Sequence, residues 1–244
     1  MRITGISIAS LLVCARLMAA DQGFIITSTF TLDRGKPISM TNYLSPDHAR
    51  WASSVGDLIV DARSGQMISV DNDSKSYYVI TREDINAATA AMKKLPPGQQ
   101  KQAEVMTFDV QKAGTSRKIA GYTCENWIVA MGSTSRSDEC LTTELNPASP
   151  AWDMYRSFSD AMREMTVSMG PWSVDIQAMR EQFKKMKGVP LSSKTTMDVM
   201  GQKMSQSTEV TDIKRGEIPA SAWQVPAGYK KVENPLREAL AMRR

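Results

Sequence analysis

The stretch GYTCENWIVAMGSTSRSDECL (121–141) places Cys124 and Cys140 on either side of a polar centre, GSTSRS. The flanking segments YTCENWIVAM and DECLTTEL alternate apolar and polar residues, as strands do. A turn centred near Gly132 sets the two cysteines about opposite each other on paired antiparallel strands, where facing residues come within disulfide reach. The stretch predicts a β-hairpin.

The N-terminus, MRITGISIASLLVCARLMAADQG, has the layout of a secretory signal peptide. Arg2 supplies the positive end, residues 6–13 form an apolar run too short to span a bilayer, and cleavage falls after Ala19 or Ala20. The alternative is a buried N-terminal helix. Lipid attachment at Cys14 is disfavoured because the preceding residue, Val13, is not small. We expect a periplasmic or secreted protein.

Removal of residues 1–20 would take Cys14 away and leave Cys124 and Cys140. An even cysteine count in an exported chain favours a disulfide, and two reduced core cysteines are the alternative. A redox-active site usually has a closely spaced pair such as CxxC, and this sequence has none. The expected disulfide is therefore structural.

The remaining 224 residues would carry 28 basic and 26 acidic side chains. A net charge of +2 is too small to indicate a nucleic-acid partner or an anionic membrane surface. No later segment is apolar and long enough to span a membrane. We therefore expect a soluble chain without stable membrane insertion.

Strand patterns dominate the chain on both sides of the quoted hairpin. In the first of them Phe24, Ile26, Phe30 and Leu32 share one face, and threonines occupy the other. Short strands joined by tight polar turns follow, which is an antiparallel meander. The predicted strands are ISMTNYL, GDLIVDA, QMISVD, SYYVITR, AEVMTFDVQ, LSSKTTMDVM and KMSQSTEVTDI.

Two segments have helical patterns. The first begins at Thr81, which caps it with Asp84 three residues on, and ends at Pro96-Pro97-Gly98. The second is an insert at about 147–187, interrupted by Gly170-Pro171, whose methionines and phenylalanines form a stripe. Such a stripe fits either plain core packing or a movable lid over an apolar groove.

These patterns predict a mainly β protein with helices (α+β), built as a curved antiparallel sheet or incomplete β-barrel that helices cover. We expect a signal peptide (1–20), one β-rich domain (21–233) containing the insert, and a polar C-terminal tail (234–244).

Two motifs carry a resemblance to a known family: IAGYTC (119–124) and PAGY (226–229). Their order resembles a bacterial envelope family labelled a domain of unknown function, and SKSYYVITREDI (74–85) is similar to the middle strand and helix start of that family. That family in turn is similar to the LolA/LolB lipoprotein-carrier superfamily. The resemblance implies an incomplete antiparallel barrel whose apolar concave face is covered by helices and receives acyl chains.

Signals for catalysis or for a cofactor are weak. His48 is the only histidine and follows a turn opener, so we expect it in a surface loop, without a metal. The acidic turn at 71–73 lacks the Gly and Glu of a calcium loop. None of the GxSxG, P-loop, GxGxxG or HExxH motifs occurs. No cofactor is expected, and nothing in the carboxylate spacing recommends a hydrolase.

The preferred hypothesis is a non-enzymatic periplasmic protein that binds a lipid, an acyl chain or a hydrophobic peptide. The alternative is an envelope structural or partner-binding module with a filled core, whose protein partner the sequence does not identify. The predicted apolar ligand-binding residues are Phe24, Ile26, Phe30, Met40, Met154, Phe158, Met162 and Met165.

Overall fold

The structure is a computed structural model, and it describes a large part of the chain. The described residues are 21–93, 105–145, 149–154, 156–157, 159–160, 173–199, 201–235 and 237. The predicted signal peptide lies outside them, as do part of the predicted helical insert and most of the predicted tail.

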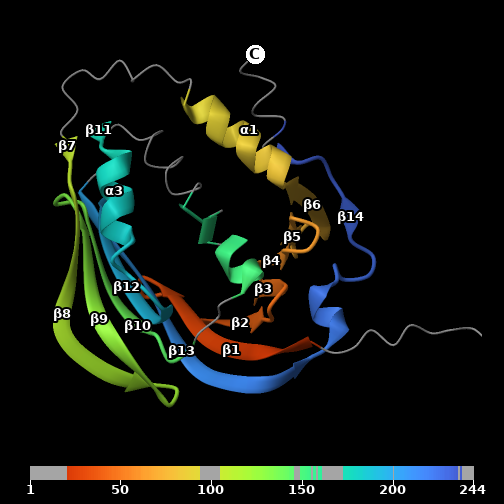
Figure 1. Ribbon diagram of the computed structural model, residues 1–244, viewed down its shortest axis with the longest axis horizontal. Helices are drawn as coiled ribbons and strands as arrows, with labels where there is room; N and C mark the ends of the chain where they lie inside the picture. The colour runs from red at the N-terminus through yellow and green to blue at the C-terminus, as the bar shows by residue number, and fades with distance from the viewer. Residues whose placement is uncertain are drawn as a thin grey trace, which may run out of the picture.

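One open, curved sheet of 12 strands forms the body of the protein (Figure 1). The strands are β1 (Asp21–Leu32), β2 (Ile38–Leu44), β3 (His48–Ser53), β4 (Gly56–Asp61), β5 (Gln66–Asp71), β6 (Ser76–Thr81), β8 (Phe108–Ile119), β9 (Tyr122–Met131), β10 (Ser135–Thr142), β12 (Val189–Val199), β13 (Gln202–Ile218) and β14 (Lys230–Lys231). Their order across the sheet is β14-β6-β5-β4-β3-β2-β1-β13-β12-β10-β9-β8. All neighbours are antiparallel except β14 and β6. The prediction of a mainly β protein with a curved antiparallel sheet is confirmed.

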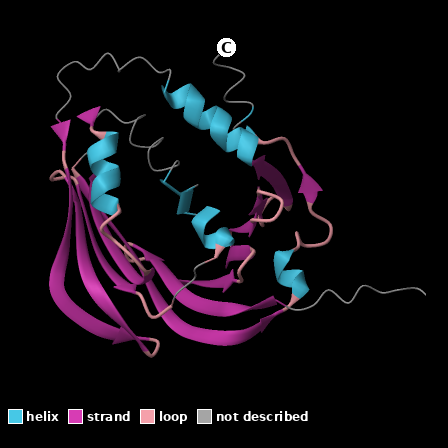
Figure 2. Ribbon diagram, in the orientation of Figure 1, coloured by secondary structure: helices cyan, strands magenta, loops and turns pink. Residues whose placement is uncertain are grey.

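The remaining described elements are few (Figure 2). They are the helices α1 (Arg82–Lys93) and α3 (Ile176–Phe183), helical residues at 150–154, the 3₁₀ turn η1 (Ala220–Trp223), and a two-stranded parallel pair of β7 (Val105–Met106) and β11 (Ser173–Val174). Helices α1 and α3 lie on the concave side of the sheet, α3 against β8 and α1 beyond β6. The more extensive helical cover expected from the sequence stays a prediction.

The long central strands β1 and β13 join the two halves of the sheet. β1 pairs with β2 on one side and with β13 on the other. Its alternation places Ile26 and Ser28 on one face, and both are buried. Between Thr27 and Ser28 the register with β13 shifts by one residue, since their partners are Asp212 and Val210. Bulges of this kind bend a strand, which suits the curvature seen here.

The β9–β10 hairpin forms as predicted, and Cys124 and Cys140 are joined by a disulfide across a Cα–Cα distance of 5.3 Å. The expected register is off by two residues, because the strands pair Met131 with Ser135 and the turn therefore centres on Ser133. Cys140 consequently lies opposite Asn126, and the disulfide links diagonal neighbours on one face. Both cysteines are buried.

The sequence patterns missed the strand β3. It pairs with β2 and with β4, and its Ala49 lies fully buried opposite Val60. Only six residues long, β3 begins at His48, directly after the turn, and has an arginine between its two core residues Ala49 and Trp51. Pairing on both sides, which is a tertiary effect, therefore decides its conformation.

The helix expected to run on from Trp172 is found, among the described residues, only from Ile176. Ser173 and Val174 are extended and pair with β7, and Asp175 then starts α3. The Asp175 carboxylate accepts a hydrogen bond from the backbone N–H of Ala178 at 2.9 Å, which is a side-chain N-cap. Aspartate at this position therefore separates strand from helix.

The start of α1 agrees with the sequence expectation. The Thr81 hydroxyl accepts from the Asp84 N–H at 3.2 Å, and the Asp84 carboxylate accepts from the Thr81 N–H at 2.9 Å. This reciprocal pair is a capping box in which aspartate replaces the usual glutamate. The start of the C-terminal segment packs against the same place, because Asn234 and Arg237 also donate to Asp84.

Candidate functional site

A cavity of about 320 Å³ lies on the concave face of the sheet, over its central strands. Strands β1, β2 and β3 contribute to one side of it and strands β10, β12 and β13 to the other. Nine of the fifteen described lining residues are apolar. They are Ile26, Met40, Leu44, Trp51, Trp152, Val189, Pro190, Leu191 and Val210.

The strand order explains how these residues meet. Ser28 on β1 lies between Met40 of β2 and Val210 of β13, so one row across the sheet contributes three lining residues. The next row places Ile26 beside Asn42. Alternation along the paired strands keeps these side chains on one face.

Two of the predicted ligand-binding residues, Ile26 and Met40, line this cavity. Phe24 is half-buried and packs against the main core cluster, with the guanidinium of Arg215 5.2 Å above its ring. Phe30 lies half-buried farther along β1 and is not among the described lining residues.

The residues predicted from the insert are only partly described. Met154 is half-buried and packs against the main core cluster. Phe158, Met162 and Met165 lie outside the residues whose side chains the structure describes. In the second half of the insert, Met179 is buried and Met186 packs against the cluster around Trp127.

The sequence patterns did not predict the two tryptophans that line the cavity, Trp51 and Trp152. Trp51 comes from β3 and Trp152 from the helical residues 150–154, and their rings stack with centroids 6.2 Å apart. A usable signal was the alternation of Ala49 and Trp51, which is visible only once β3 is recognised as a strand.

A hydroxyl network marks the β10–β12 side of the cavity. The Glu139 carboxylate accepts hydrogen bonds from the Ser137 and Ser193 hydroxyls at 3.0 and 3.4 Å. Thr195 donates to the Ser137 hydroxyl at 3.0 Å. Glu139 and Ser193 both line the cavity, so its β10–β12 side has a polar margin.

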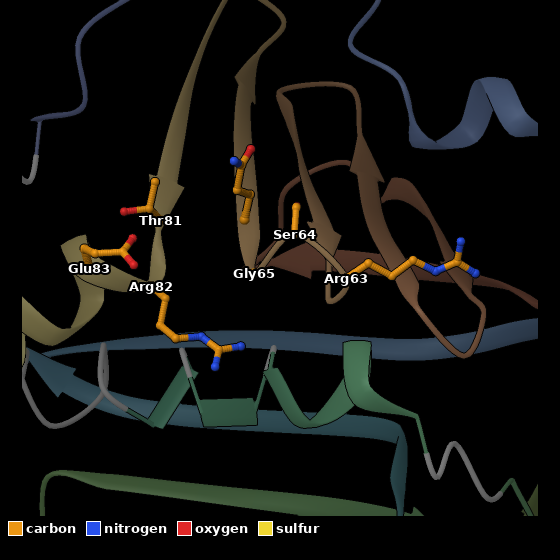
Figure 3. A pocket seen from close by; sticks show the side chains of 7 residues that line it. Arg63, Ser64, Gly65, Thr81, Arg82 and Glu83 are labelled. Atoms are coloured by element: carbon orange, nitrogen blue, oxygen red, sulfur yellow. The ribbon is translucent and has the colours of Figure 1, made fainter.

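A second pocket, of about 300 Å³, lies where α1 starts, beside the β4–β5 turn (Figure 3). Two of its lining residues are arginines. Arg63 is bonded to the carboxylate of Asp47 at 2.6 Å, and the guanidinium groups of Arg63 and Arg82 point to different places in Figure 3. Because the charges do not converge on one point, this pocket is the weaker candidate for a ligand site.

The expectation of a surface-loop histidine is wrong, because His48 is the first residue of β3. Its Nδ1 lies 2.9 Å from a carboxylate oxygen of Asp21, and its ring stacks on Trp223 at 5.2 Å. The Ser45 hydroxyl also bonds to Asp21, on the Nδ1 side of the ring, while Nε2 faces Asp61 at 3.8 Å. A hydrolytic triad needs the serine at the other ring nitrogen, so this cluster does not have that geometry.

Within the described ranges, no group of three or more His, Cys, Asp or Glu side chains is arranged to hold a metal ion. The described helices likewise include none that is long and apolar enough to cross a bilayer.

An open twelve-stranded sheet with an apolar cavity on its concave face places the chain among mainly β proteins that form a cavity over a single curved sheet. Within that class it belongs to the family described as Domain of unknown function (DUF4412), whose pattern matches residues 25–229. This agrees with the resemblance to a domain-of-unknown-function family. Among curated proteins no match was found.

Solved structures of similar shape are distant. PNGF-II is 11% identical with a TM-score of 0.43, over 90% of this chain and 33% of that one. The MucA/MucB complex of Pseudomonas aeruginosa is 13% identical with a TM-score of 0.44, over 86% of this chain and 58% of that one. A LolA superfamily protein of Nitrosomonas europaea is 5% identical with a TM-score of 0.27, over 84% of this chain and 90% of that one. This chain thus spans about a third of PNGF-II, and none of these likenesses is close enough to bear on function.

Proposed function

We propose that this protein is a non-enzymatic binding protein that holds an acyl chain or another hydrophobic ligand in the concave cavity. The observation that carries the proposal is the cavity itself, at about 320 Å³ with nine apolar lining residues. Ligand sites in proteins range from about 300 to 1,000 Å³ and are mostly apolar with a few polar groups. This cavity is at the lower end of that range.

The expected affinity follows from the apolar area that a ligand would bury. Each buried methylene contributes about 0.8 kcal/mol, so a chain segment of about eight methylenes contributes about 6 kcal/mol. That corresponds to a dissociation constant on the order of tens of micromolar before ordering costs. A ligand of this kind would bind reversibly, as transport or transient storage requires.

We place the protein in the periplasm or another exported compartment. The proposal is supported by the signal-peptide pattern at 1–20 and by the Cys124–Cys140 disulfide, since disulfides persist in oxidising compartments. An envelope structural or partner-binding module with a filled core is the alternative, and the test below distinguishes the two.

Titration with the methyl ester of a fluorescent fatty acid, which carries no charge, tests the proposal, with Met40→Trp as the blocking variant. Met40 is half-buried and lines the cavity, so the larger indole would fill it. Ser39→Trp is the matched control, because Ser39 is exposed on the opposite face of the same strand.

We expect a saturable fluorescence change with the natural sequence and with Ser39→Trp, and at least a tenfold weaker response with Met40→Trp. The absence of any response from the natural sequence would reject the binding function and favour the partner-binding module. Equal responses from the two tryptophan variants would place the ligand elsewhere.

A further inference from the structure

Two residues that line the cavity each have a buried polar atom without a hydrogen-bond partner among the described residues: Ser28 Oγ and Asn42 Oδ1. Ser28 is only 2% exposed. The two residues lie on adjacent strands, with Ser28 opposite Met40 and Asn42 opposite Ile26, so they are diagonal neighbours on the lining face.

Such unpartnered atoms are unusual, because about nine in ten buried polar groups in proteins are bonded. A buried polar atom without a partner destabilises the fold, and an apolar side chain of similar shape would avoid that cost. Around Ser28 and Asn42 the lining is apolar, with Ile26, Met40 and Val210 as strand neighbours. A bound ligand that supplies the missing partners would remove the cost.

The chemistry of the two atoms restricts that ligand. Asn42 Oδ1 only accepts hydrogen bonds, so its partner must donate one. The Ser28 hydroxyl can donate or accept. An amide satisfies both, with its N–H toward Asn42 and its carbonyl toward Ser28, and a hydroxyl group can do the same.

Charge restricts the ligand further. The described lining residues include no lysine or arginine, and the one ionisable side chain among them, Glu139, is itself acidic. A ligand carboxylate placed beside Ser28 would lose its hydration and gain no described cation in exchange, which is costly. A neutral polar group avoids this cost.

We infer that the ligand is a neutral amphiphile that carries an N–H or O–H donor, as an amide or hydroxyl group, within reach of Ser28 and Asn42. The inference rests on the proposed function and specifies its ligand class. It distinguishes a neutral amide or alcohol from a free fatty acid of the same length.

The test is displacement of the fluorescent probe by three ligands of equal chain length: dodecanamide, methyl dodecanoate and dodecanoate. The ester lacks a donor and the carboxylate is charged, so each isolates one requirement. We expect the amide to bind about five- to tenfold more tightly than either of the others, the usual effect of one buried hydrogen bond.

The variants Asn42→Leu and Ser28→Ala show whether these two side chains cause the preference. Neither substitution removes a side-chain hydrogen bond to a described residue, so the melting temperature without ligand should stay level or rise. The amide should lose its advantage in Asn42→Leu while the affinity for the ester is kept. Ser39→Ala, on the opposite face of β2, should leave the affinities for the amide and for the ester unchanged.

The outcomes separate the two proposals. If the probe itself does not bind, the proposed function fails. If the probe binds but the three ligands compete equally, or do not compete, the ligand class is wrong and the binding function stands. A preference for the amide that persists in both variants, or variants that melt markedly lower without ligand, would likewise overturn the role of Ser28 and Asn42.

Discussion

At the scale of single residues, Asp84 joins two segments that are distant in the sequence, the start of α1 and the start of the C-terminal segment. Its carboxylate caps α1 through Thr81, accepts from Asn234 Nδ2 at 3.1 Å and pairs with Arg237 at 2.6 Å. The side chain is buried, with 8% of its surface exposed. Asp84 therefore holds the start of the C-terminal segment against the first helix.

The charge on Asp84 should make stability depend on pH. Burial raises its pKa, but the hydrogen bonds from Arg237 and Thr81 outweigh burial and lower the pKa to about 2. Because the folded pKa is below the ordinary value near 4, this stabilisation is complete above that value and is lost as the pH falls through about 2. We expect Asp84→Asn to lower the free energy of unfolding by about 2 kcal/mol at pH 7.

Urea unfolding at pH 7 and from pH 4 downward measures this effect. The difference between Asp84→Asn and the natural sequence should narrow as the pH falls toward 2, where Asp84 itself is protonated. Asp73→Asn, in the exposed β5–β6 turn, is the control and should change little. A difference that stays constant over this range would show that the charge of Asp84 is not responsible.

Arg50 and Asp57 form a buried ion pair between β3 and β4, with side chains 14% and 5% exposed. Arg50 also donates to the Ala222 carbonyl at 2.9 Å, which fastens η1 to the sheet. We expect Arg50→Leu to cost about 3–5 kcal/mol in urea unfolding, because it leaves the Asp57 carboxylate buried and unpaired. The double variant Arg50→Leu/Asp57→Leu should recover part of the loss. A double variant less stable than the single one would contradict this explanation.

At the scale of elements, the β9–β10 hairpin is the feature whose covalent link can be tested directly. The disulfide closes a sequence separation of 16 residues, which the chain-entropy model values at about 3 kcal/mol. We expect the double variant Cys124→Ala/Cys140→Ala to have a free energy of unfolding in urea that is lower by about this amount, and therefore to unfold at a lower urea concentration. Added reductant should destabilise the natural sequence and leave the variant unchanged. Two freely titrating thiols in protein from its native compartment would contradict the disulfide.

Much of the strand pattern follows from alternation in the sequence. The predicted strands ISMTNYL and YTCENWIVAM coincide with β2 and β9, and the cap at Thr81 follows from local chemistry. Elements that depend on distant partners were missed or misassigned. β3, with Ala49 and Trp51 as its core residues, is stabilised by strands on both sides. Ser173 and Val174, which the sequence patterns assign to a helix, pair instead with β7.

At the scale of the whole molecule, the strand order determines the candidate site. β1 lies between β2 and β13, so residues near the start of the chain share a cavity with Val210. Local patterns identified Ile26 and Met40 as apolar residues on the right face. They could not identify Val210 or Trp152 as neighbours, because the pairing of β1 with β13 is not encoded in any local pattern.

The same limit applies to the unpartnered atoms. In the sequence, Ser28 is one polar residue within an apolar stripe and Asn42 one polar residue in an alternating strand. Their burial side by side becomes visible only when β1 and β2 are paired. The sequence could therefore not indicate the two unpartnered atoms, although its alternation placed Ile26 and Met40 on the faces that line the cavity.

Native mass spectrometry of the protein purified from its own compartment, with extraction of anything bound, is the most direct test of the central claim. We expect a population whose mass exceeds that of the polypeptide by one small amphiphile, and we expect Met40→Trp to lose that population while Ser39→Trp retains it. A polypeptide mass alone, in a protein whose disulfide is intact and whose fold is stable, would contradict a ligand-holding cavity.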